Sequence, residues 1–563
     1  MTGRALLAAL LLLAPPALRA QGEPRDTLGL RPAFRLVDQF AAQLLAQEGT
    51  PGLALALVDR RGLITVRTYG YADLERKLPV TPQTRFQIGS ISKSFTAIAL
   101  LQLADEGRFD PNRPVRNVLS WFNPRTEWRP VTAHDLLTHT SGLPADRDDV
   151  PSSKAQAYMA RERTLGSAPG SHWAYSNIGY QVLGVLLETL ERERYPAIIR
   201  RRLLGPLGMD ATLAEFTHEH RLAMAKGYAP LFDDRPARRG DPLVEAPWIE
   251  YGSGDGSLVS TPADLGRYLT MLLNRGAGPD GRLLSERGYA ALMQPRAPVG
   301  EGGAQYGYGM FLGTLDGRPS FWHSGGMLGY SSFLIGEPAL GVGAIAFVNG
   351  PGDPGGMARF ALRALAAAMR GDSLPALPPP ADPLRVDSAA QYAGLYHGPS
   401  GDTLRFEASG DSLLLVEPHC RTALEPRGDD SFLGPVPRFA RFPLRFARDS
   451  GRVIGVAYGG DWYVGERYRG PLRFPAPAAW SAYVGHYRIM QPWRPAFRVI
   501  LRRGRLYLVD PEGGEEPLTP IGNGEFRVGD VYSAERLVFS DVADGQALVA
   551  TLSGMRYYRA FTP

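Results

Sequence analysis

The stretch "FQIGSISKSFTAIALLQLADEG" (residues 86–107) carries Ser90 and Lys93, a Ser-x-x-Lys pair at the start of an apolar run with helical spacing. On a helix, residues three apart share a face, with β-carbons about 5–6 Å apart. Serine needs a neighbouring base to become a nucleophile, and a helix N-terminus favours a developing oxyanion. The pair therefore predicts a nucleophile with its own base. The alternative is that Ser90 caps the helix and Lys93 extends to solvent.

The surroundings of Lys93 favour the first interpretation. An ammonium group inside a largely apolar helix is costly unless it is paired or neutral. The chain has only four lysines, so few chance matches to Ser-x-x-Lys are expected. The other three are Lys77, Lys154 and Lys226.

Length and composition indicate a folded protein of several domains. The chain has 563 residues, 44% of them apolar and 21% charged, and domains usually hold about 150 residues. The net charge of +5 and the lack of a Lys/Arg run argue against a nucleic-acid partner. The lone Cys420 excludes an intramolecular disulfide and a cysteine-built metal site. Without a Walker or Rossmann glycine pattern, we expect no cofactor and no metal.

Residues 1–20 have the pattern of a secretory signal peptide. Arg4 precedes a short apolar run, and Leu18-Arg19-Ala20 forms a cleavage site before Gln21. The run is too short to cross a bilayer, and no later stretch is apolar enough to be a transmembrane span. We therefore expect a periplasmic or secreted protein. The alternative is a buried N-terminal helix.

The pattern of residues 33–372 predicts one α+β domain. Apolar spacing indicates helices and a strand hairpin, followed by more helices, a run of strands and a last helix. The helix at 261–275 has Thr261 as its N-cap and Pro262 in its first turn. The expected segments are helices at 33–48, 177–193, 261–275 and 355–371, a hairpin of 52–59 with 63–73, and strands within 306–349.

The rest of the chain predicts two small all-β modules, each a barrel or lipocalin-like. The proline-rich segment 373–383 is typical of a stiff linker, and short alternating strands follow it. Residues 389–418 resemble residues 480–511, because both begin with an aromatic residue before a Gly-x-Tyr and continue as two strands around a tight turn. We expect the modules at 384–472 and 478–563, with a second linker near 470–479.

Two further motifs can complete a site around Ser90. Tyr175 and Asn177 precede a helix, where a tyrosine hydroxyl can move a proton and an asparagine can hold a lysine or a substrate amide. His323, Gly325 and Gly326 lie in a strand, where glycines let another backbone approach closely. The alternatives are an Asn177 N-cap, a core Tyr175, a structural His323 and a glycine bulge.

Together the three motifs resemble the serine β-lactamases and penicillin-binding peptidases. They occur in one order, separated by roughly 80 and 150 residues. Three further stretches look like this family, namely "LLTHTSGL" (136–143), "PLGMDAT" (206–212) and "GSLVSTPADLGRYL" (256–269). The likeness covers residues 33–370 and is greatest to the branch with class C β-lactamases, D-alanyl-D-alanine carboxypeptidases, D-aminopeptidases and esterases. His134 and His139 are expected to be structural.

The resemblance implies a fold and roles for residues. The fold would be an antiparallel sheet flanked by helices, with a helical subdomain. Ser90 would be the acylated nucleophile, Lys93 and Tyr175 would share general-base and general-acid work, and Asn177 would orient them. His323 and Gly325 would mark the substrate-binding strand. The amides of Ser90 and Gly326 would form the oxyanion hole.

One departure from the family bears on the substrate. Many β-lactamases and carboxypeptidases have lysine where this chain has His323, and a histidine of ordinary pKa is mostly neutral at pH 7. His323 would therefore attract a substrate carboxylate less, and a lysine in its place should raise activity on such substrates. Histidine at this place is found among D-aminopeptidases and esterases. In D-aminopeptidases of the family, a C-terminal barrel can reach the cleft, so deleting residues 471–563 should change specificity.

The main prediction is an exported serine hydrolase acting on esters or D-aminoacyl peptides and amides. Its partner would be a small molecule or a peptide, including peptides derived from peptidoglycan. One alternative is a D-alanyl-D-alanine carboxypeptidase or β-lactamase. An alternative of another class is a non-catalytic cell-wall peptide binder. The presence of Ser90, Lys93, Tyr175 and Asn177 together argues against a binder, which needs no proton relay.

Overall fold

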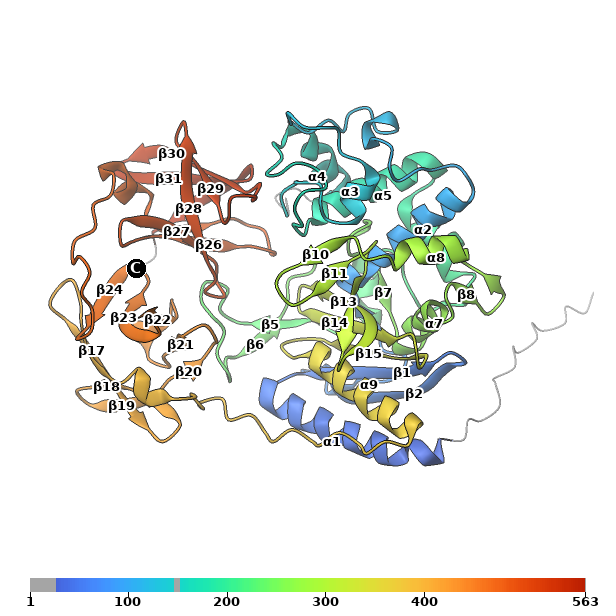
Figure 1. Cartoon of the computed structure of the whole chain (residues 1–563), viewed down its shortest axis with the longest axis horizontal. Coiled ribbons are helices and arrows are strands. Elements are labelled where there is room, and N and C mark those ends of the chain that lie inside the picture. Colours follow the sequence, from blue (N-terminus) through green and yellow to red (C-terminus); the bar gives the residue numbers. More distant parts are fainter. Residues whose placement is uncertain (1–26, 146–151, 562–563) are drawn as a thin grey trace, which may run out of the picture.

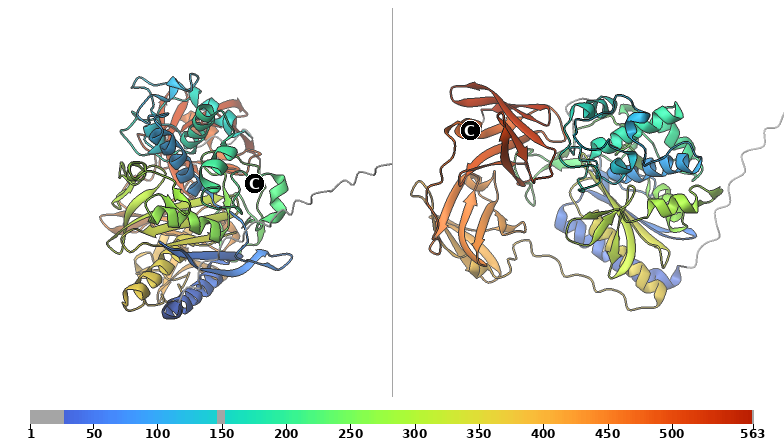
Figure 2. Two further views of the ribbon diagram at one scale, coloured as in Figure 1. Left: turned by 90° about the vertical axis from the view of Figure 1, so that its right-hand side faces the viewer. Right: turned by 45° about the horizontal axis from the view of Figure 1, so that its top comes forward.

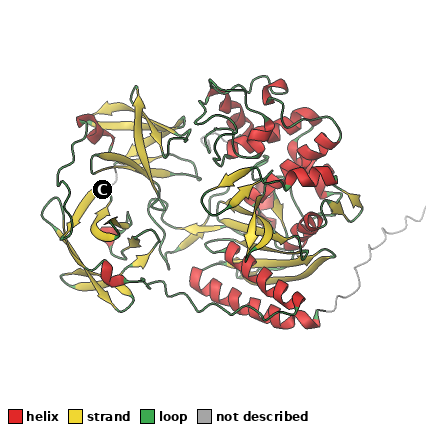
Figure 3. Ribbon diagram, viewed as in Figure 1, coloured by secondary structure: helices red, strands yellow, loops and turns green. Residues whose placement is uncertain are grey.

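The computed structural model describes residues 27–145 and 152–561 (Figure 1). The expected signal peptide lies outside this part. Helices and strands are mixed in the N-terminal part of the chain, whereas the C-terminal part is almost all strand (Figure 3). An extended segment joins the two parts, and the last β module lies beside the N-terminal part in two views (Figures 1 and 2).

A nine-stranded antiparallel sheet forms the centre of the N-terminal part. The strand order is β10-β11-β12-β13-β14-β15-β1-β2-β3, so the N-terminal hairpin pairs with the last strand, β15. The predicted hairpin at 52–59 and 63–73 is confirmed. The strands are β1 (Gly52–Asp59), β2 (Gly62–Asp73), β3 (Leu78–Pro79), β10 (Ala297–Val299), β11 (Ala304–Tyr306), β12 (Phe311–Leu315), β13 (Arg318–Met327), β14 (Tyr330–Glu337) and β15 (Val342–Val348).

Both faces of the sheet are buried at its central strands β1, β14 and β15. Alternate residues of β1 face opposite sides, as the period of two requires: Leu55 packs in the core under helices α1 (Arg31–Glu48) and α9 (Pro354–Arg370), and Ala56 packs in the larger core on the other face. Because neither face meets water, β1 is a continuous apolar run. The larger core also holds the helices α2 (Ser92–Asp105), α3 (Ala133–Leu137), α5 (Asn177–Glu191), α6 (Tyr195–Ile199), α7 (Pro262–Leu273) and α8 (Glu286–Leu292).

Local sequence signals decide where several helices begin. Helix α7 begins after Thr261, whose hydroxyl accepts a hydrogen bond from the Asp264 amide, as predicted. Helix α3 begins with a capping box between Thr132 and Asp135. The short helix α4 (Ser153–Met159) begins after Ser152, which caps the Ala155 amide.

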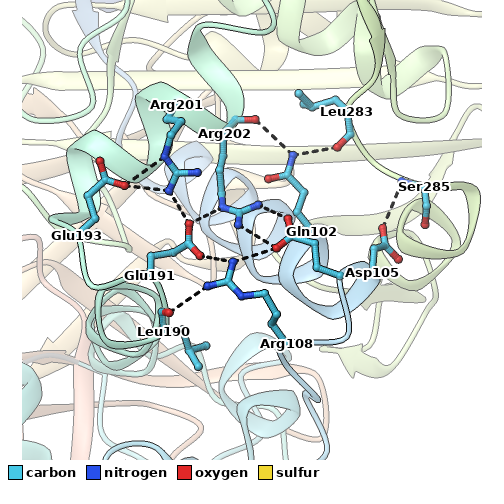
Figure 4. A network of polar contacts seen from close by, with 11 residues as sticks. Gln102, Asp105, Arg108, Leu190, Glu191, Glu193, Arg201, Arg202, Leu283 and Ser285 are labelled. Atoms are coloured by element: carbon cyan, nitrogen blue, oxygen red, sulfur yellow. Dashed lines mark hydrogen bonds and ion pairs between the residues drawn. The ribbon is translucent and has the colours of Figure 1, made fainter.

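An ion-pair network ties α2 to the end of α5 (Figure 4). Arg202 lies in a π-helical turn (Arg200–Leu204) and contacts Glu191 at 3.0 Å and Glu106 at 2.8 Å. Arg108 adds a 2.7 Å contact to Glu191. Since the side chains of Arg202 and Glu191 are only 9% and 3% exposed, water screens this pair less than a surface pair.

The two C-terminal modules differ in closure. The first is a nine-stranded sheet in the order β19-β18-β17-β16-β24-β23-β22-β21-β20, and the second is a closed eight-stranded barrel, β25 to β32. The first module consists of β16 (Gly394–His397), β17 (Thr403–Ser409), β18 (Ser412–Glu417), β19 (Cys420–Ala423), β20 (Glu425–Pro426), β21 (Ser431–Leu433), β22 (Leu444–Asp449), β23 (Arg452–Tyr458) and β24 (Asp461–Gly465). The barrel consists of β25 (Gly485–Arg488), β26 (Ala496–Arg502), β27 (Arg505–Val509), β28 (Glu515–Gly522), β29 (Glu525–Val528), β30 (Arg536–Ala543), β31 (Gln546–Leu552) and β32 (Met555–Ala560).

The repeated aromatic motif makes the same contact in both modules. The Tyr396 hydroxyl donates to the Tyr392 carbonyl at 2.8 Å, and the Tyr487 hydroxyl donates to the Tyr483 carbonyl at 2.8 Å. Each tyrosine ring belongs to the core of its module. The sequence repeat is therefore also a structural repeat.

A loop of the N-terminal part reaches both modules. It runs between β5 (Tyr228–Pro230) and β6 (Leu243–Glu245). Asp233 pairs with Arg488 at 2.6 Å and Asp234 with Arg498 at 3.1 Å, both on the barrel. Arg238 donates to the Phe439 carbonyl of the first module at 3.3 Å. Residues 231–242, hereafter the bridging loop, therefore contribute to the placement of the barrel.

Candidate active site

Lys93 lies at the centre of the candidate site. Its side chain is fully buried, and its Nζ donates to Ser90 Oγ at 2.9 Å, Asn177 Oδ1 at 2.6 Å and the Asp255 carbonyl at 2.9 Å. An ammonium has three donors, so these acceptors satisfy all of them. The alternative that Lys93 extends to solvent is wrong.

Ser90 does not cap the helix. It lies in a 3₁₀ turn, η2 (Gly89–Ile91), and α2 begins at Ser92 with Ile91 at the N-cap position and no side-chain cap. The Ser90 side chain is therefore not used in capping, and its hydroxyl accepts from Lys93 instead. The spacing of three still brings the two side chains together, because the 3₁₀ turn continues into the α-helix.

Tyr175 and Asn177 approach Lys93 from the start of α5. Ser176 is the N-cap of this helix and accepts a hydrogen bond from the Gly179 amide at 3.2 Å. Asn177 is thus the first helical residue and not the cap, and its side-chain oxygen is turned to Lys93. The Tyr175 ring centre lies 4.9 Å from Lys93 Nζ.

His323 lies in the core of the domain, although its strand borders the site. It is 1% exposed, with Nε2 3.0 Å from the Tyr306 hydroxyl and Nδ1 2.6 Å from the Ser324 carbonyl. Burial lowers the pKa of His323 to about 3, against the hydrogen bond to Ser324, and Lys93 lowers it further. His323 is therefore neutral at pH 7. Within the described residues it does not line the cavity at Ser90.

Gly325 of β13 and Gly89 of the Ser90 turn let the strand and the turn lie directly against each other. A β-carbon on Gly325 would stand 1.9 Å from the Ile88 carbonyl oxygen, and one on Gly89 would stand 2.7 Å from the Gly326 nitrogen. Gly89 also has φ of +49°, a conformation that glycine adopts readily. This close approach places Gly326 at the cavity that contains Ser90.

A cavity of about 520 Å³ opens over Ser90, within the range of ligand sites. The last barrel forms much of its wall. Residues of the N-terminal part that line it include Ser90, Tyr175, Asn177, Tyr251, Asp255 and Gly326, and those of the barrel include Arg494, Asp510, Glu516, Asp530, Tyr532 and Glu535.

The barrel side of the cavity carries several carboxylates. Burial raises the pKa of Glu516, and the neighbouring Asp530 and Asp510 raise it further, whereas Arg494 lowers it. On the opposite wall, burial raises the pKa of Asp255, although Lys93 opposes the shift. The cavity is therefore a poor environment for an additional anion.

His139, which was expected to be structural, contacts the residues that lead into α5 at the site. Its Nδ1 accepts from the Ser176 amide at 3.1 Å, and its ring centre lies 4.2 Å from that of Tyr175. Burial lowers the pKa of His139 well below its usual value, and Lys93 and His323 lower it further. A neutral ring is required here, because Nδ1 must accept. The signal in the sequence was its place within the 136–143 stretch.

Residues 27–145 and 152–561 lack both a metal-binding cluster and a membrane-spanning helix. No group of three or more His, Cys, Asp or Glu side chains there is arranged to hold a metal ion. None of the helices in that part combines the length and apolar character needed to cross a bilayer.

Comparison with known proteins agrees with this geometry. The model of the Beta-lactamase family matches residues 37–368, more than half of the chain. The chain belongs to the β-lactamase family. Its matched part contains Ser90, Lys93, Tyr175, Asn177 and His323.

Curated relatives match over a similar region. Protein flp of Staphylococcus aureus strain N315 is 27% identical over 331 residues, which cover 56% of this chain and 62% of that protein. The unguisins hydrolase ungD' of Aspergillus campestris is 30% identical over 338 residues, covering 55% of this chain and 60% of that protein. The chain thus spans about three fifths of the length of these relatives.

Solved structures share the fold. The octameric penicillin-binding protein homologue from Pyrococcus abyssi has a TM-score of 0.56 and 24% identity, covering 77% of this chain and 99% of that one. SurE has a TM-score of 0.50 and 24% identity, covering 78% and 100%. These likenesses show a β-lactamase/transpeptidase-like fold, followed here by the two all-β modules.

Proposed function

We propose that this chain is an exported serine hydrolase that forms an acyl-enzyme on Ser90 and acts on esters or D-aminoacyl peptides and amides. The observation that carries the proposal is the contact of a fully buried lysine with a serine at the mouth of a cavity. An apolar residue at this buried position would stabilise the fold at least as well as a lysine. A serine hydroxyl, however, needs a base to attack a carbonyl, and Lys93 can be that base.

The proposed reaction has two halves. The attacking form has Lys93 as a neutral amine with a free lone pair. Ser90 Oγ bonds to the substrate carbonyl carbon while its proton passes to this amine, and the amides of Ser90 and Gly326 stabilise the oxyanion. When the bond to the leaving group breaks, that group takes the proton through Lys93 or Tyr175. Water then attacks the acyl-enzyme, its proton returns to Ser90 Oγ, and the acid is released. Asn177 holds Lys93 in place through both halves.

The electrostatics of the cavity support the substrate class. His323 is buried and neutral, so it supplies no positive charge for a substrate carboxylate. The carboxylates Asp510, Glu516 and Asp530 on the barrel wall oppose an anionic substrate. Neutral esters and substrates with an ammonium group are compatible with this wall. We therefore rank them above β-lactams and D-alanyl-D-alanine peptides, which carry a carboxylate.

Hydrolysis assays test the proposal directly. The mature protein and Ser90→Ala are compared on a short-chain nitrophenyl ester, a D-alanine anilide and a chromogenic cephalosporin. We expect turnover of the ester or the anilide above that of the cephalosporin, with the Ser90→Ala rate falling by about 10³-fold or more. Equal rates for the two proteins on every substrate would contradict the proposal. Export is tested separately, by whether the N-terminus of the secreted product is Gln21.

A further inference from the structure

The segment Gly529–Glu535 of the last barrel packs tightly against the N-terminal part. It connects β29 to β30 and lines the cavity. The rings of Tyr532 and His172 stack with centres 4.3 Å apart. A β-carbon on Gly166 would lie 2.4 Å from the Tyr532 carbonyl oxygen. The contact therefore requires a glycine on the facing surface, which indicates a fitted interface.

Glu535 connects the barrel to the N-terminal part by a hydrogen bond. Its Oε1 accepts a hydrogen bond from the Ala145 amide at 2.9 Å. Its Oε2 accepts from the Ser553 hydroxyl, and its own amide donates to Ser533 Oγ at 3.1 Å. The carboxylate is thus held within the barrel while it binds a backbone group of the other domain.

Ala145 continues this connection to Asn177. The Asn177 amide donates to the Ala145 carbonyl at 2.8 Å, and the Asn177 side chain accepts from Lys93 at 2.6 Å. One peptide segment therefore receives a hydrogen bond from the first turn of α5 and gives one to the barrel. A displacement of Ala145 would move the first turn of α5, and with it the acceptor of Lys93.

We infer that Glu535 is a positioning residue for the Lys93–Asn177 pair, so that the last barrel completes the active site. The expected effect on catalysis rests on the proposed function. The hydrogen bonds that connect Glu535 to Asn177 do not depend on it. Glu535 touches neither Ser90 nor Lys93 in these contacts and acts through Ala145. Its removal should affect the chemical step more than the binding of a small ester.

Three substitutions at one position test the inference. Glu535→Ala removes the acceptor of the Ala145 amide. Glu535→Asp keeps the carboxylate on a side chain that is one methylene group shorter. Glu535→Gln keeps a carbonyl oxygen that can accept from Ala145. On a nitrophenyl ester we expect kcat to fall about tenfold for the alanine and aspartate variants, with KM changing by less than about threefold. The glutamine variant should stay within about twofold of the wild type. Glu525→Ala, on the same barrel, is the matched control.

Amide hydrogen exchange supplies a readout that does not depend on activity. Exchange across residues 174–181 should be faster in Glu535→Ala and Glu535→Asp and unchanged in Glu535→Gln and Glu525→Ala. If the wild type hydrolyses none of the substrates while this pattern holds, the proposed function has failed and the coupling stands. If the alanine and aspartate variants keep the wild-type kcat or exchange, the inference is wrong. If the glutamine variant loses as much kcat as the alanine variant, an acceptor at position 535 is not sufficient. The proposed connection from Glu535 through Ala145 to Asn177 is then also wrong.

Discussion

At the residue scale, two adjacent glycines differ in whether the structure has room for a side chain. Gly325 faces the Ile88 carbonyl, where a β-carbon would stand at 1.9 Å, whereas a β-carbon on Gly326 would meet nothing within 4 Å. Gly325→Ala must push β13 away from the Ser90 turn. We expect it to lower the free energy of unfolding by about 2–4 kcal/mol and to abolish most activity.

Gly326→Ala is the matched control for that variant. It should keep the wild-type melting temperature within about 2 °C, because its methyl group extends into open space. Its effect should fall on kcat/KM for bulky substrates, since Gly326 lines the cavity. Thermal unfolding and ester hydrolysis of both variants check the prediction. Equal melting temperatures would show that β13 yields to a methyl group at Gly325.

The buried His323 predicts a dependence of stability on pH. The folded pKa of His323 is about 3, below the ordinary value near 6.5. Between these values the unfolded chain binds a proton that the folded chain does not. The free energy of unfolding should therefore fall as the pH drops from 6.5 to 3, with His323 contributing up to about 5 kcal/mol. Above pH 6.5 neither state of His323 binds a proton, so the free energy of unfolding no longer changes with pH because of His323.

Denaturant unfolding at pH 7, 5 and 4 measures this slope. His323→Gln removes the titrating group and keeps a donor and an acceptor, so its slope should be shallower than that of the wild type. His397→Gln, which replaces an exposed histidine of β16, should leave the slope unchanged. Identical slopes in all three proteins would mean that His323 is not the group responsible.

At the element scale, the network between α2 and α5 stabilises more than a surface ion pair. Arg202 is 9% exposed and its partner Glu191 is 3% exposed. Removing Arg202 leaves a buried carboxylate with fewer partners, so Arg202→Ala should cost roughly 2–3 kcal/mol. The pair of Arg363 with Asp316 is 40% and 46% exposed, so Arg363→Ala should cost less than about 1 kcal/mol. Urea unfolding of both variants compares the two costs, and equal costs would contradict the prediction.

Sequence signals predicted elements best where the cause is local. The cap of α7 at Thr261, the hairpin of β1 and β2, and the repeated Gly-x-Tyr segment depend on short stretches, and the structure confirms them. The 3₁₀ turn before α2 could not be predicted, because a 3₁₀ turn and an α-helix have similar spacing over three residues.

The contacts that complete the site could not be predicted from any local pattern. Glu535 lies 390 residues from Ala145 in the chain, and nothing near either residue indicates their pairing. The place of His323 in the core depends on Tyr306 of β11, which is separated from β13 by β12 in the sheet. The contact of Ser90 with Lys93 was predictable because both residues lie within four positions of the sequence.

At the scale of the whole molecule, the bridging loop contributes to the placement of the barrel that lines the cavity. Asp234 is 17% exposed and Arg498 is 13% exposed, so their ion pair is largely removed from water. Asp233→Ala with Asp234→Ala would leave Arg488 and Arg498 of the barrel without their bridging-loop partners. We expect this to weaken the docking of the barrel by roughly 2–4 kcal/mol.

Loosened docking should be visible far from the substitutions. We expect faster hydrogen exchange within residues 529–535 and a lower kcat in the double variant, because the barrel contact at Glu535 acts on Asn177 through Ala145. Asp411→Ala removes an exposed carboxylate of the first β module and should change neither quantity. If the double variant exchanges like the wild type, the barrel is held by the Tyr532 and Glu535 contacts alone. In that case Glu535→Ala should increase the exchange within residues 529–535 more than the double variant does. The two variants together then show whether the bridging loop or the Glu535 contact holds the barrel in place.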